Sequence, residues 1–274
     1  MLPNDLRDIK LLVLDIDGTM CLCDDFFPFT KRCIDTLNGL DMDYLVFTNN
    51  SSRQIPYYEE KFKKNGINVG GEKILLASHV VAHYLLTNHK GKTIYPVSTK
   101  AIVSYFENEG IEINDSNPDI VVVCFDEELT YEKLVKACRF IRNGAEFIAA
   151  NPDIRYPDRG GGYLPDCGSI AKIITASIER EPLLFLGKPS KITLDYILHK
   201  TRYNENEVCF VGDRLYTDIA ITHNTEAKSI LVLTGEAKES DIKPYEIQYG
   251  IKPDFTLDSL EKLTEMVERL GHEE

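Results

Sequence analysis

The stretch KLLVLDIDGT, residues 10–19, decides the fold of this chain. After Lys10 comes the apolar run LLVL, which ends at the acid Asp15, and this is typical of a strand buried in a parallel sheet. Asp15 and Asp17 stand where this strand stops, and Gly18 follows them. Because open α/β sheets bind ligands at the carboxyl ends of their strands, the two carboxylates are candidate site residues. An Asp-Gly pair after a strand also makes an ordinary turn, and this stretch alone does not separate the two interpretations.

Short apolar runs alternate with helix-patterned segments along the rest of the chain. This alternation predicts an α/β protein with a parallel sheet and crossover helices. The predicted strands are residues 10–15, 44–48, 93–96, 119–124, 146–149, 183–187, 208–212 and 229–233. The predicted helices are residues 30–40, 55–65, 73–86, 100–109, 131–143, 170–178, 191–199, 217–221 and 257–270.

The middle of the chain has a strand–helix alternation of its own, which predicts a second domain inserted into the first. We expect residues 1–71 and 183–274 to form the core and residues 72–182 to form the inserted domain. A loop rich in Gly, Pro and Asp is expected over residues 151–168. Long ordered loops in compact proteins tend to carry function.

Two further predicted strands end in groups that suit a phosphate. One ends in Thr48-Asn49-Asn50, whose hydroxyl and amide groups donate hydrogen bonds without adding negative charge. Another ends in Lys188, a point charge suited to pairing with an anion. Each ending also has an ordinary explanation, an Asn-rich turn or helix N-cap in the first case and a surface lysine in the second.

A fourth predicted strand, VCFVG, ends in Asp213, and Asp218 follows it closely. Carboxylates from different strand ends can converge on Mg²⁺, which prefers oxygen ligands. The four strand ends together supply a nucleophile, an acid or base, neutral donors, a cation and metal ligands. A single strand ending of this kind is weak evidence for a site. The four together favour a site for phosphoryl transfer over the interpretation that each is an unrelated turn.

The composition of the chain indicates the cellular compartment and the kinds of partner that the protein can have. The net charge is −13 and the isoelectric point is about 5.0, which disfavours nucleic acid as a partner. The seven cysteines are odd in number and form no CxxC pair, which argues against a disulfide framework and a structural zinc site. No signal-peptide segment and no membrane-length apolar run occurs. We therefore expect a soluble protein of the reducing cytoplasm with no membrane partner.

The combined motifs resemble those of the haloacid dehalogenase (HAD) superfamily. Asp15-Ile-Asp-Gly-Thr is similar to its first motif, Thr48-Asn-Asn to its second, Lys188 to its third, and Gly212-Asp213 with Asp218 to its fourth. The form TNN, the sequence GKPS and the spacing of the fourth motif resemble the NagD-like branch, which includes p-nitrophenyl phosphatases and pyridoxal phosphatase. Residues 129–153 are similar to the cap domain of that branch. The chain departs from the family at residues 223–225, where HNT replaces a stretch of small residues.

The resemblance implies a Rossmann-like HAD core with an inserted α/β cap, and a Mg²⁺-dependent phosphatase. It implies that Asp15 is the nucleophile and that Asp17 is the general acid and then the general base. The implied metal ligands are Asp15, the backbone carbonyl of Asp17, and Asp213, with Asp218 orienting the metal's waters or Lys188. The residues expected to bind the phosphoryl group are Thr48, Asn49, Asn50 and Lys188.

We therefore expect hydrolysis of small phosphate monoesters, such as sugar phosphates, through a phosphoaspartate on Asp15. Two alternatives stay open: a phosphotransferase or mutase that uses the same phosphoaspartate, and a catalytically silent regulatory protein of the same fold. A Rossmann dehydrogenase is disfavoured because no GxGxxG follows the first strand. The cap loop around Tyr163 to Gly168 is expected to influence which substrate is used. A homodimer through the cap is implied by the resemblance alone.

His79 and His83 lie four residues apart on a predicted helix, which is a spacing that two metal ligands can have. No third ligand accompanies them in the sequence, and we expect both to be structural. Cys167 lies in the cap loop and is expected near the substrate pocket, without a role as nucleophile.

Overall fold

The computed structural model describes residues 7–40, 42–158, 160 and 162–270. The chain divides into two compact units. The first, called the core unit here, consists of the residues up to Thr48, Ile55–Leu75 and the residues from Ile197. The second, the middle unit, consists of Asn49–Gln54 and Leu76–Tyr196.

The core unit contains a six-stranded sheet with the order β14-β13-β12-β1-β4-β5. Its strands are β1 (Leu11–Leu14), β4 (Asp43–Thr48), β5 (Ile74–Leu76), β12 (Val208–Gly212), β13 (Lys228–Val232) and β14 (Phe255–Leu257). The strands from β14 through β4 run parallel to one another. Every residue of β1 and β12 is buried, as expected for apolar strands at the centre of a parallel sheet. The predicted α/β class with a parallel-sheet core is confirmed.

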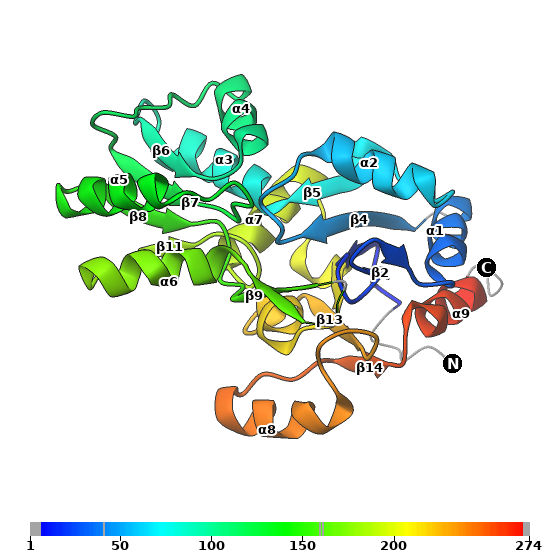
Figure 1. The fold of residues 1–274 in the computed structure, drawn as a ribbon. Helices are drawn as coiled ribbons and strands as arrows, with labels where there is room; N and C mark the ends of the chain where they lie inside the picture. Colours follow the sequence, from blue (N-terminus) through cyan, green and yellow to red (C-terminus); the bar gives the residue numbers. More distant parts are fainter. Residues whose placement is uncertain (1–6, 41, 159, 161, 271–274) are drawn as a thin grey trace. The chain divides into compact units, whose positions relative to one another are not determined.

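The helices of the core unit are α1 (Thr30–Gly39), α2 (Ile55–Lys64), α8 (Glu239–Tyr249) and α9 (Leu260–Leu270). Helices α1 and α9 lie side by side, although they come from opposite ends of the chain (Figure 1). In α9, Leu260, Leu263 and Val267 are buried at helical spacing. A small antiparallel hairpin of β2 (Cys21–Leu22) and β3 (Asp25–Phe26) follows the loop after β1.

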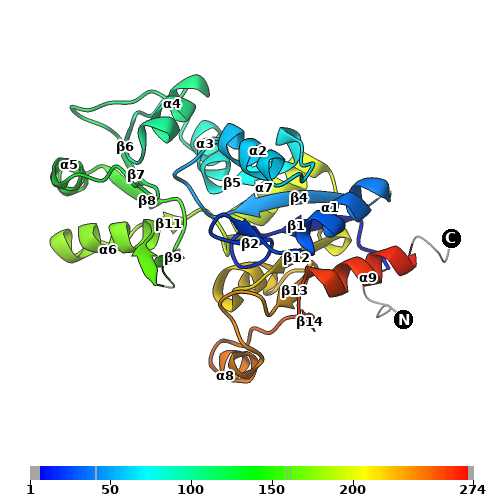
Figure 2. The ribbon, with the colours of Figure 1, turned by 45° about the vertical axis from the view of Figure 1, so that its right-hand side comes forward.

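The middle unit contains a four-stranded parallel sheet with the order β11-β8-β7-β6. Its strands are β6 (Ile94–Val97), β7 (Ile120–Val123), β8 (Glu146–Ala149) and β11 (Leu184–Phe185), and its helices are α3 (Ala77–Asn88), α4 (Lys100–Asn108), α5 (Tyr131–Arg142) and α6 (Cys167–Ile178). Helices α5 and α6 pack on one face of this sheet, and α3 and α4 lie on the other face (Figure 2). Helix α7 (Lys191–Thr201) continues from the middle unit into the core unit.

Four of the predicted elements differ from the structure. Residues 73–86 were predicted as one helix, but they begin with the edge strand β5, and α3 follows it without a loop. The apolar spacing in this segment fits a helix throughout, so the pattern hides the short strand. Residues 151–168 contain a hairpin of β9 (Arg155–Pro157) and β10 (Tyr163–Pro165) instead of a structureless loop. The predicted helix over 217–221 is a π-helical turn, Leu215–Ile219, followed by a 3-10 turn.

The fourth difference concerns the strand before Lys188. It was expected in the core, but β11 pairs with β8 in the sheet of the middle unit. The elements β2, β3, β14 and α8 were also not predicted, because the strands are only two or three residues long and no residue of α8 is fully buried. Residues 49–54 and 183–196, which were expected in the core, belong to the middle unit. Where the core and inserted domains themselves begin and end stays a prediction.

Replacing Phe106 with alanine is expected to lower the free energy of unfolding by about 3–5 kcal/mol, because the ring lies in α4 with none of its surface exposed. The matched control is Tyr131→Ala, which removes an aromatic ring that is 82% exposed in the same unit. That control is expected to change stability by no more than about 0.5 kcal/mol. Chemical denaturation followed by circular dichroism measures both, and equal losses would contradict this account of the core.

Candidate active site

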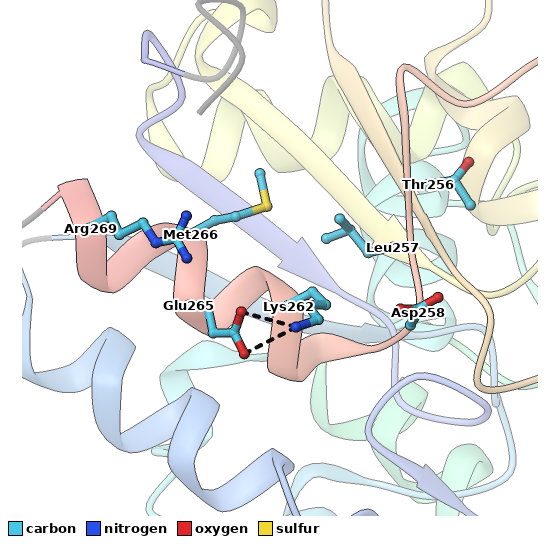
Figure 3. A pocket seen from close by; sticks show the side chains of 7 residues that line it. All are labelled: Thr256, Leu257, Asp258, Lys262, Glu265, Met266 and Arg269. Atoms are coloured by element: carbon cyan, nitrogen blue, oxygen red, sulfur yellow. Dashed lines mark hydrogen bonds and ion pairs between the residues drawn. The ribbon is translucent and has the colours of Figure 1, made fainter. Parts of the chain in front are cut away.

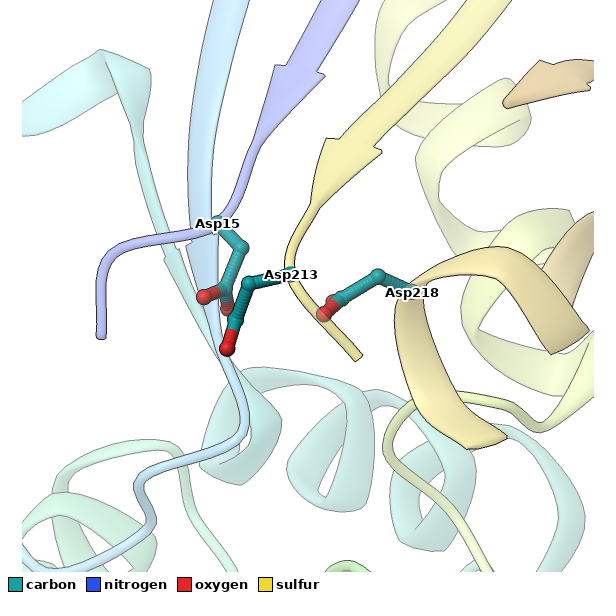
Figure 4. A group of neighbouring side chains, drawn as sticks. All are labelled: Asp15, Asp213 and Asp218. Carbon is teal, nitrogen blue, oxygen red and sulfur yellow. The ribbon is translucent and has the colours of Figure 1, made fainter. Parts of the chain in front are cut away.

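Three carboxylates of the core unit lie together at one end of its sheet. Asp15, Asp213 and Asp218 each place one oxygen within 4.8 Å of the others (Figure 4). Asp15 directly follows β1, and Asp213 directly follows β12. The two strands are parallel neighbours with Leu14 opposite Val211, and the N–H of Asp15 donates to the carbonyl of Val211 at 2.9 Å. The side chains that follow the two strands therefore emerge at the same place.

Asp218 reaches this group from the π-helical turn that follows β12. Its Oδ2 accepts the backbone N–H of Arg214 at 3.0 Å, which fixes the carboxylate against the loop. The close packing requires glycine at position 212, because a Cβ there would lie 2.2 Å from Cγ of Asp218. Asp218 is thus held beside Asp213 by the local fold of residues 212–218.

Asp213 is deeply buried, with 2% of its surface exposed, as is Asp218. Burial first, and then the negative charge of Asp218, raise its pKa to about 7. Its Oδ2 accepts the N–H of Glu236 at 2.6 Å, while its Oδ1 is buried and has no hydrogen-bond partner among the described residues. The buried Oδ1 of Asp213 and the neighbouring carboxylates would be stabilised by a bound cation. Carboxylate oxygens are ligands that divalent ions such as Mg²⁺ prefer. The residues present therefore fit a metal ion.

A loop after β13 closes over Asp213 and was not predicted as part of the site. A Cβ at Gly235 would lie 2.0 Å from Oδ2 of Asp213, and one at Gly18 would lie 2.4 Å from the same atom. Gly18 also has a φ of +93°, which favours glycine. The hydroxyl of Thr234 donates to the carbonyl of Gly18 at 2.6 Å, which ties this loop to the first motif. Thr234 and Gly235 directly follow the predicted strand 229–233, and this position was the signal in the sequence that could have placed them at the site.

Asp17 is not among the three clustered carboxylates. It belongs to a tight turn in which the N–H of Met20 donates to the carbonyl of Ile16 at 2.8 Å, and the N–H of Gly18 donates to the carbonyl of Cys21 at 2.7 Å. Burial, and then the charge of Asp17, raise the pKa of the Cys21 thiol to about 12. Lys61, from α2, anchors the hairpin after this turn by donating to the carbonyl of Cys23 at 2.6 Å.

In the middle unit, the side chain of Asn49 is hydrogen-bonded to the backbone of Lys188. Its Nδ2 donates to the carbonyl of Lys188 at 2.9 Å, and its Oδ1 accepts the N–H of Lys188 at 2.9 Å. The same Nδ2 donates to Oδ2 of Asp153 at 3.2 Å, and Asn151 donates to the carbonyl of Asn49 at 2.7 Å. Asn151 and Asp153 were not predicted as site residues, although they follow a predicted strand in the same way as the other motifs.

Thr48 and Asn50 flank Asn49 in the sequence and differ in their surroundings. Thr48 is the last residue of β4 and is buried. The Oδ1 of Asn50 accepts the N–H and the hydroxyl of Ser52, both at 2.9 Å, in the turn that its residue type favours. The core unit thus holds Asp15, Asp17, Thr48, Asp213 and Asp218, and the middle unit holds Asn49, Asn50 and Lys188.

Other features that the sequence raised lie outside these groups. The thiol of Cys167 is buried at the start of α6, donates to the carbonyl of Val123 at 3.3 Å, and has a pKa well above its ordinary value because of burial. Tyr163 and Leu164 of β10 are exposed, and the guanidinium of Arg155 lies 4.3 Å from the ring of Tyr163. The ring centroids of His83 and Tyr196 lie 4.8 Å apart, and the structural role expected for His79 and His83 stays a prediction.

A surface cavity of about 330 Å³ lies along β14 and α9 (Figure 3). It is lined in part by the ion pair of Lys262 and Glu265, whose closest atoms are 3.1 Å apart. None of the predicted site residues lines it. This cavity therefore does not explain the chemistry of the carboxylate group.

Comparison with known proteins identifies the family. A model described as haloacid dehalogenase-like hydrolase matches residues 12–112, and a HAD-hydrolase-like model matches residues 185–263. The acid sugar phosphatase of Staphylococcus haemolyticus is 31% identical over 87% of this chain and 92% of its own length. The crystal structure of a 4-nitrophenylphosphatase from Thermotoga maritima has a TM-score of 0.89 and 37% identity, covering 97% of this chain and 100% of its own.

NagD from E. coli K-12 is also similar, with a TM-score of 0.83 and 28% identity over 92% of this chain and 97% of its own. The chain belongs to the haloacid dehalogenase family of hydrolases, in its NagD-like phosphatase branch. The fold and the resemblance expected from the four motifs are confirmed.

Replacing Gly235 with alanine is expected to weaken the binding of a divalent cation by roughly 10- to 100-fold, because the added Cβ would displace the carboxylate of Asp213. The Mg²⁺ concentration that gives half of the maximal rise in melting temperature measures the affinity. Gly39→Ala is the control, since a Cβ at that position meets no atom within 4 Å. An unchanged half-maximal concentration for Gly235→Ala would show that the loop does not shape the site.

Proposed function

We propose that this enzyme hydrolyses small phosphate monoesters in the presence of Mg²⁺, with Asp15 as the residue that accepts the phosphoryl group. The observation that carries the proposal is the group of three carboxylates, each with one oxygen within 4.8 Å of the others, together with the buried Oδ1 of Asp213, which has no hydrogen-bond partner among the described residues. Such a group favours a site that holds a cation next to a nucleophilic carboxylate.

The residues that would hold the metal are Asp15, the backbone carbonyl of Asp17, and Asp213, with Asp218 orienting its water ligands. Bound Mg²⁺ would offset the negative charge of the carboxylates and of the phosphate. The acidic protein repels an anionic substrate at long range, since its net charge is −13. Local positive charge from the metal and from Lys188 is therefore needed for the substrate to bind.

In the first step, an oxygen of Asp15 forms a bond to phosphorus while the bond from phosphorus to the substrate oxygen breaks. Asp17 gives its proton to the departing alkoxide, which leaves as an alcohol. In the second step, Asp17 takes a proton from a water molecule that attacks the phosphorus, which releases inorganic phosphate and restores the carboxylate of Asp15. Thr48, Asn50 and Lys188 would hold the phosphoryl oxygens through these steps.

The substrate class proposed is a small phosphorylated metabolite such as a sugar phosphate, with p-nitrophenyl phosphate as an artificial substrate. The names of the relatives support this, since they are an acid sugar phosphatase and a 4-nitrophenylphosphatase. The segment from Tyr163 to Gly168, in which Tyr163 and Leu164 are exposed and Arg155 lies against Tyr163, is the proposed source of selectivity. A panel of phosphorylated metabolites, assayed by phosphate release, tests the substrate class.

Several finer expectations stay predictions. They are a cytoplasmic location, a homodimer through the inserted domain, and the lack of a nucleic-acid partner. Among the described residues, no helix combines the length and the apolar character needed to span a bilayer. Transfer of the phosphoryl group to an alcohol instead of water is the alternative reaction. Comparing the inorganic phosphate released with the donor consumed separates it from hydrolysis.

Asp15→Asn is expected to reduce the turnover of p-nitrophenyl phosphate with Mg²⁺ by roughly 10³-fold or more, since it removes the nucleophile. The native enzyme, quenched with acid during turnover, is expected to carry a phosphoryl group that hydroxylamine removes, and the variant is expected to carry none. Asp35→Asn is the matched control, because Asp35 is on the exposed side of α1. A fully active Asp15→Asn enzyme would exclude this mechanism.

Asp17→Asn is expected to slow substrates with poor leaving groups more than substrates with good ones. A sugar alkoxide needs a proton to leave, whereas p-nitrophenolate needs little protonation. We expect a loss larger by roughly 10-fold or more for a sugar phosphate than for p-nitrophenyl phosphate in the step that forms the phosphoenzyme. Pre-steady-state measurement of alcohol release compares the two, and equal losses would count against a general acid at this position.

A further inference from the structure

Both N–H donors and the oxygen of the Asn49 side chain make hydrogen bonds within the middle unit. Its two amide hydrogens serve the carbonyl of Lys188 and Oδ2 of Asp153, at 2.9 and 3.2 Å, and its oxygen accepts the N–H of Lys188 at 2.9 Å. We infer that Asn49 is a positioning residue that fixes the backbone of Lys188, and that its side chain does not bind the phosphoryl group. This inference deepens the proposed function and rests on it.

The hydrogen-bond capacity of an amide supports this inference. An asparagine amide has two N–H donors, and its oxygen is only an acceptor. Both donors of Asn49 already point to acceptors of the middle unit. The remaining oxygen would repel the anionic oxygens of a phosphate. The side chain therefore has nothing to offer the phosphoryl group unless it first gives up buried hydrogen bonds, which costs about 1–3 kcal/mol for each group left unpaired.

The surroundings of Asn49 show that it is held in place. Its surface is 5% exposed, and that of Lys188 is 2% exposed. Gly187 leaves room for the amide, because a Cβ at that position would lie 2.6 Å from Oδ1 of Asn49. The N–H of Gly187 donates to the carbonyl of Ala150 at 2.6 Å, and the side chain of Asn151 holds the carbonyl of Asn49. The segment before Lys188 and the loop that carries Asn49 are thus joined through residues that follow β8.

A lysine needs such support more than most residues. Its ammonium group is a point charge at the end of a flexible four-carbon chain. A fixed backbone reduces the number of positions that the charge can occupy, and small misplacements of a catalytic group are costly in rate. The reciprocal pair of hydrogen bonds from Asn49 fixes both the N–H and the carbonyl of Lys188.

A double-mutant cycle on kcat for p-nitrophenyl phosphate tests the inference, with Asn49→Ala, Lys188→Met and the double variant. Asn49→Ala alone is expected to lower kcat by about 100-fold, the scale of a misplaced catalytic group. In the Lys188→Met background the same change is expected to lower kcat by less than about threefold, because no ammonium group is left to position. A general disturbance of the fold would instead reduce kcat in both backgrounds.

Asn114→Ala is the matched control. The side chain of Asn114 also makes three hydrogen bonds to backbone groups, donating to Asn117 at 3.1 Å and accepting from Ser116 and Asn117 at 2.9 Å, but in an exposed loop of the same unit. It is expected to leave kcat unchanged. If Asn49→Ala does not give folded protein by circular dichroism, the cycle is run with Asn49→Ser, which keeps a small polar group.

Additive losses would overturn the inference, because they would mean that Asn49 acts on the reaction without Lys188. An unchanged kcat in Asn49→Ala would overturn it as well. Neither result affects the proposed function, which fails instead if the native enzyme releases no phosphate with Mg²⁺ or if Asp15→Asn remains fully active. The two proposals therefore fail in different measurements.

Discussion

The site depends on the parallel pairing of β1 with β12. Leu14 lies opposite Val211, and the hydrogen bond from Asp15 to Val211 extends this pairing by one residue beyond the strand. Two carboxylates from distant parts of the sequence consequently lie side by side at the carboxyl ends of these two central strands. A shift of register would separate them, and because both strands are fully buried, such a shift would also disturb the packing on both faces of the sheet.

Bringing carboxylates together in a buried place opposes folding, and the protein arranges the surrounding backbone to permit it. The pKa of Asp213 is raised by burial and by the charge of Asp218, which means that its surroundings destabilise the ionised carboxylate. Glycines at positions 18, 212 and 235 allow the backbone to approach the carboxylates more closely than any side chain would. The free energy that this arrangement costs is expected to be offset when a cation binds.

Much of this was visible in the sequence, because strand ends carry local signals. The apolar runs before Asp15 and Asp213 predicted buried strands, and β1 and β12 are where these runs lie. The failures have equally local causes. Strand β5 has the same apolar spacing as the helix that follows it, so its few residues do not stand out. The two residues of β11 belong to the second sheet, and no pattern within so short a strand tells which sheet it joins.

The sequence by itself determined which chemical groups are present and that they follow strands, because the alternation of apolar and polar residues is a property of neighbouring positions. Tertiary structure decided which of these groups meet. Asn49 and Lys188 are 139 positions apart, and nothing near either one indicates that the amide of the first is used by the backbone of the second. Hydrogen bonds and charge contacts between distant segments depend on how the strands are ordered and registered, and that follows only from the packing of the whole unit.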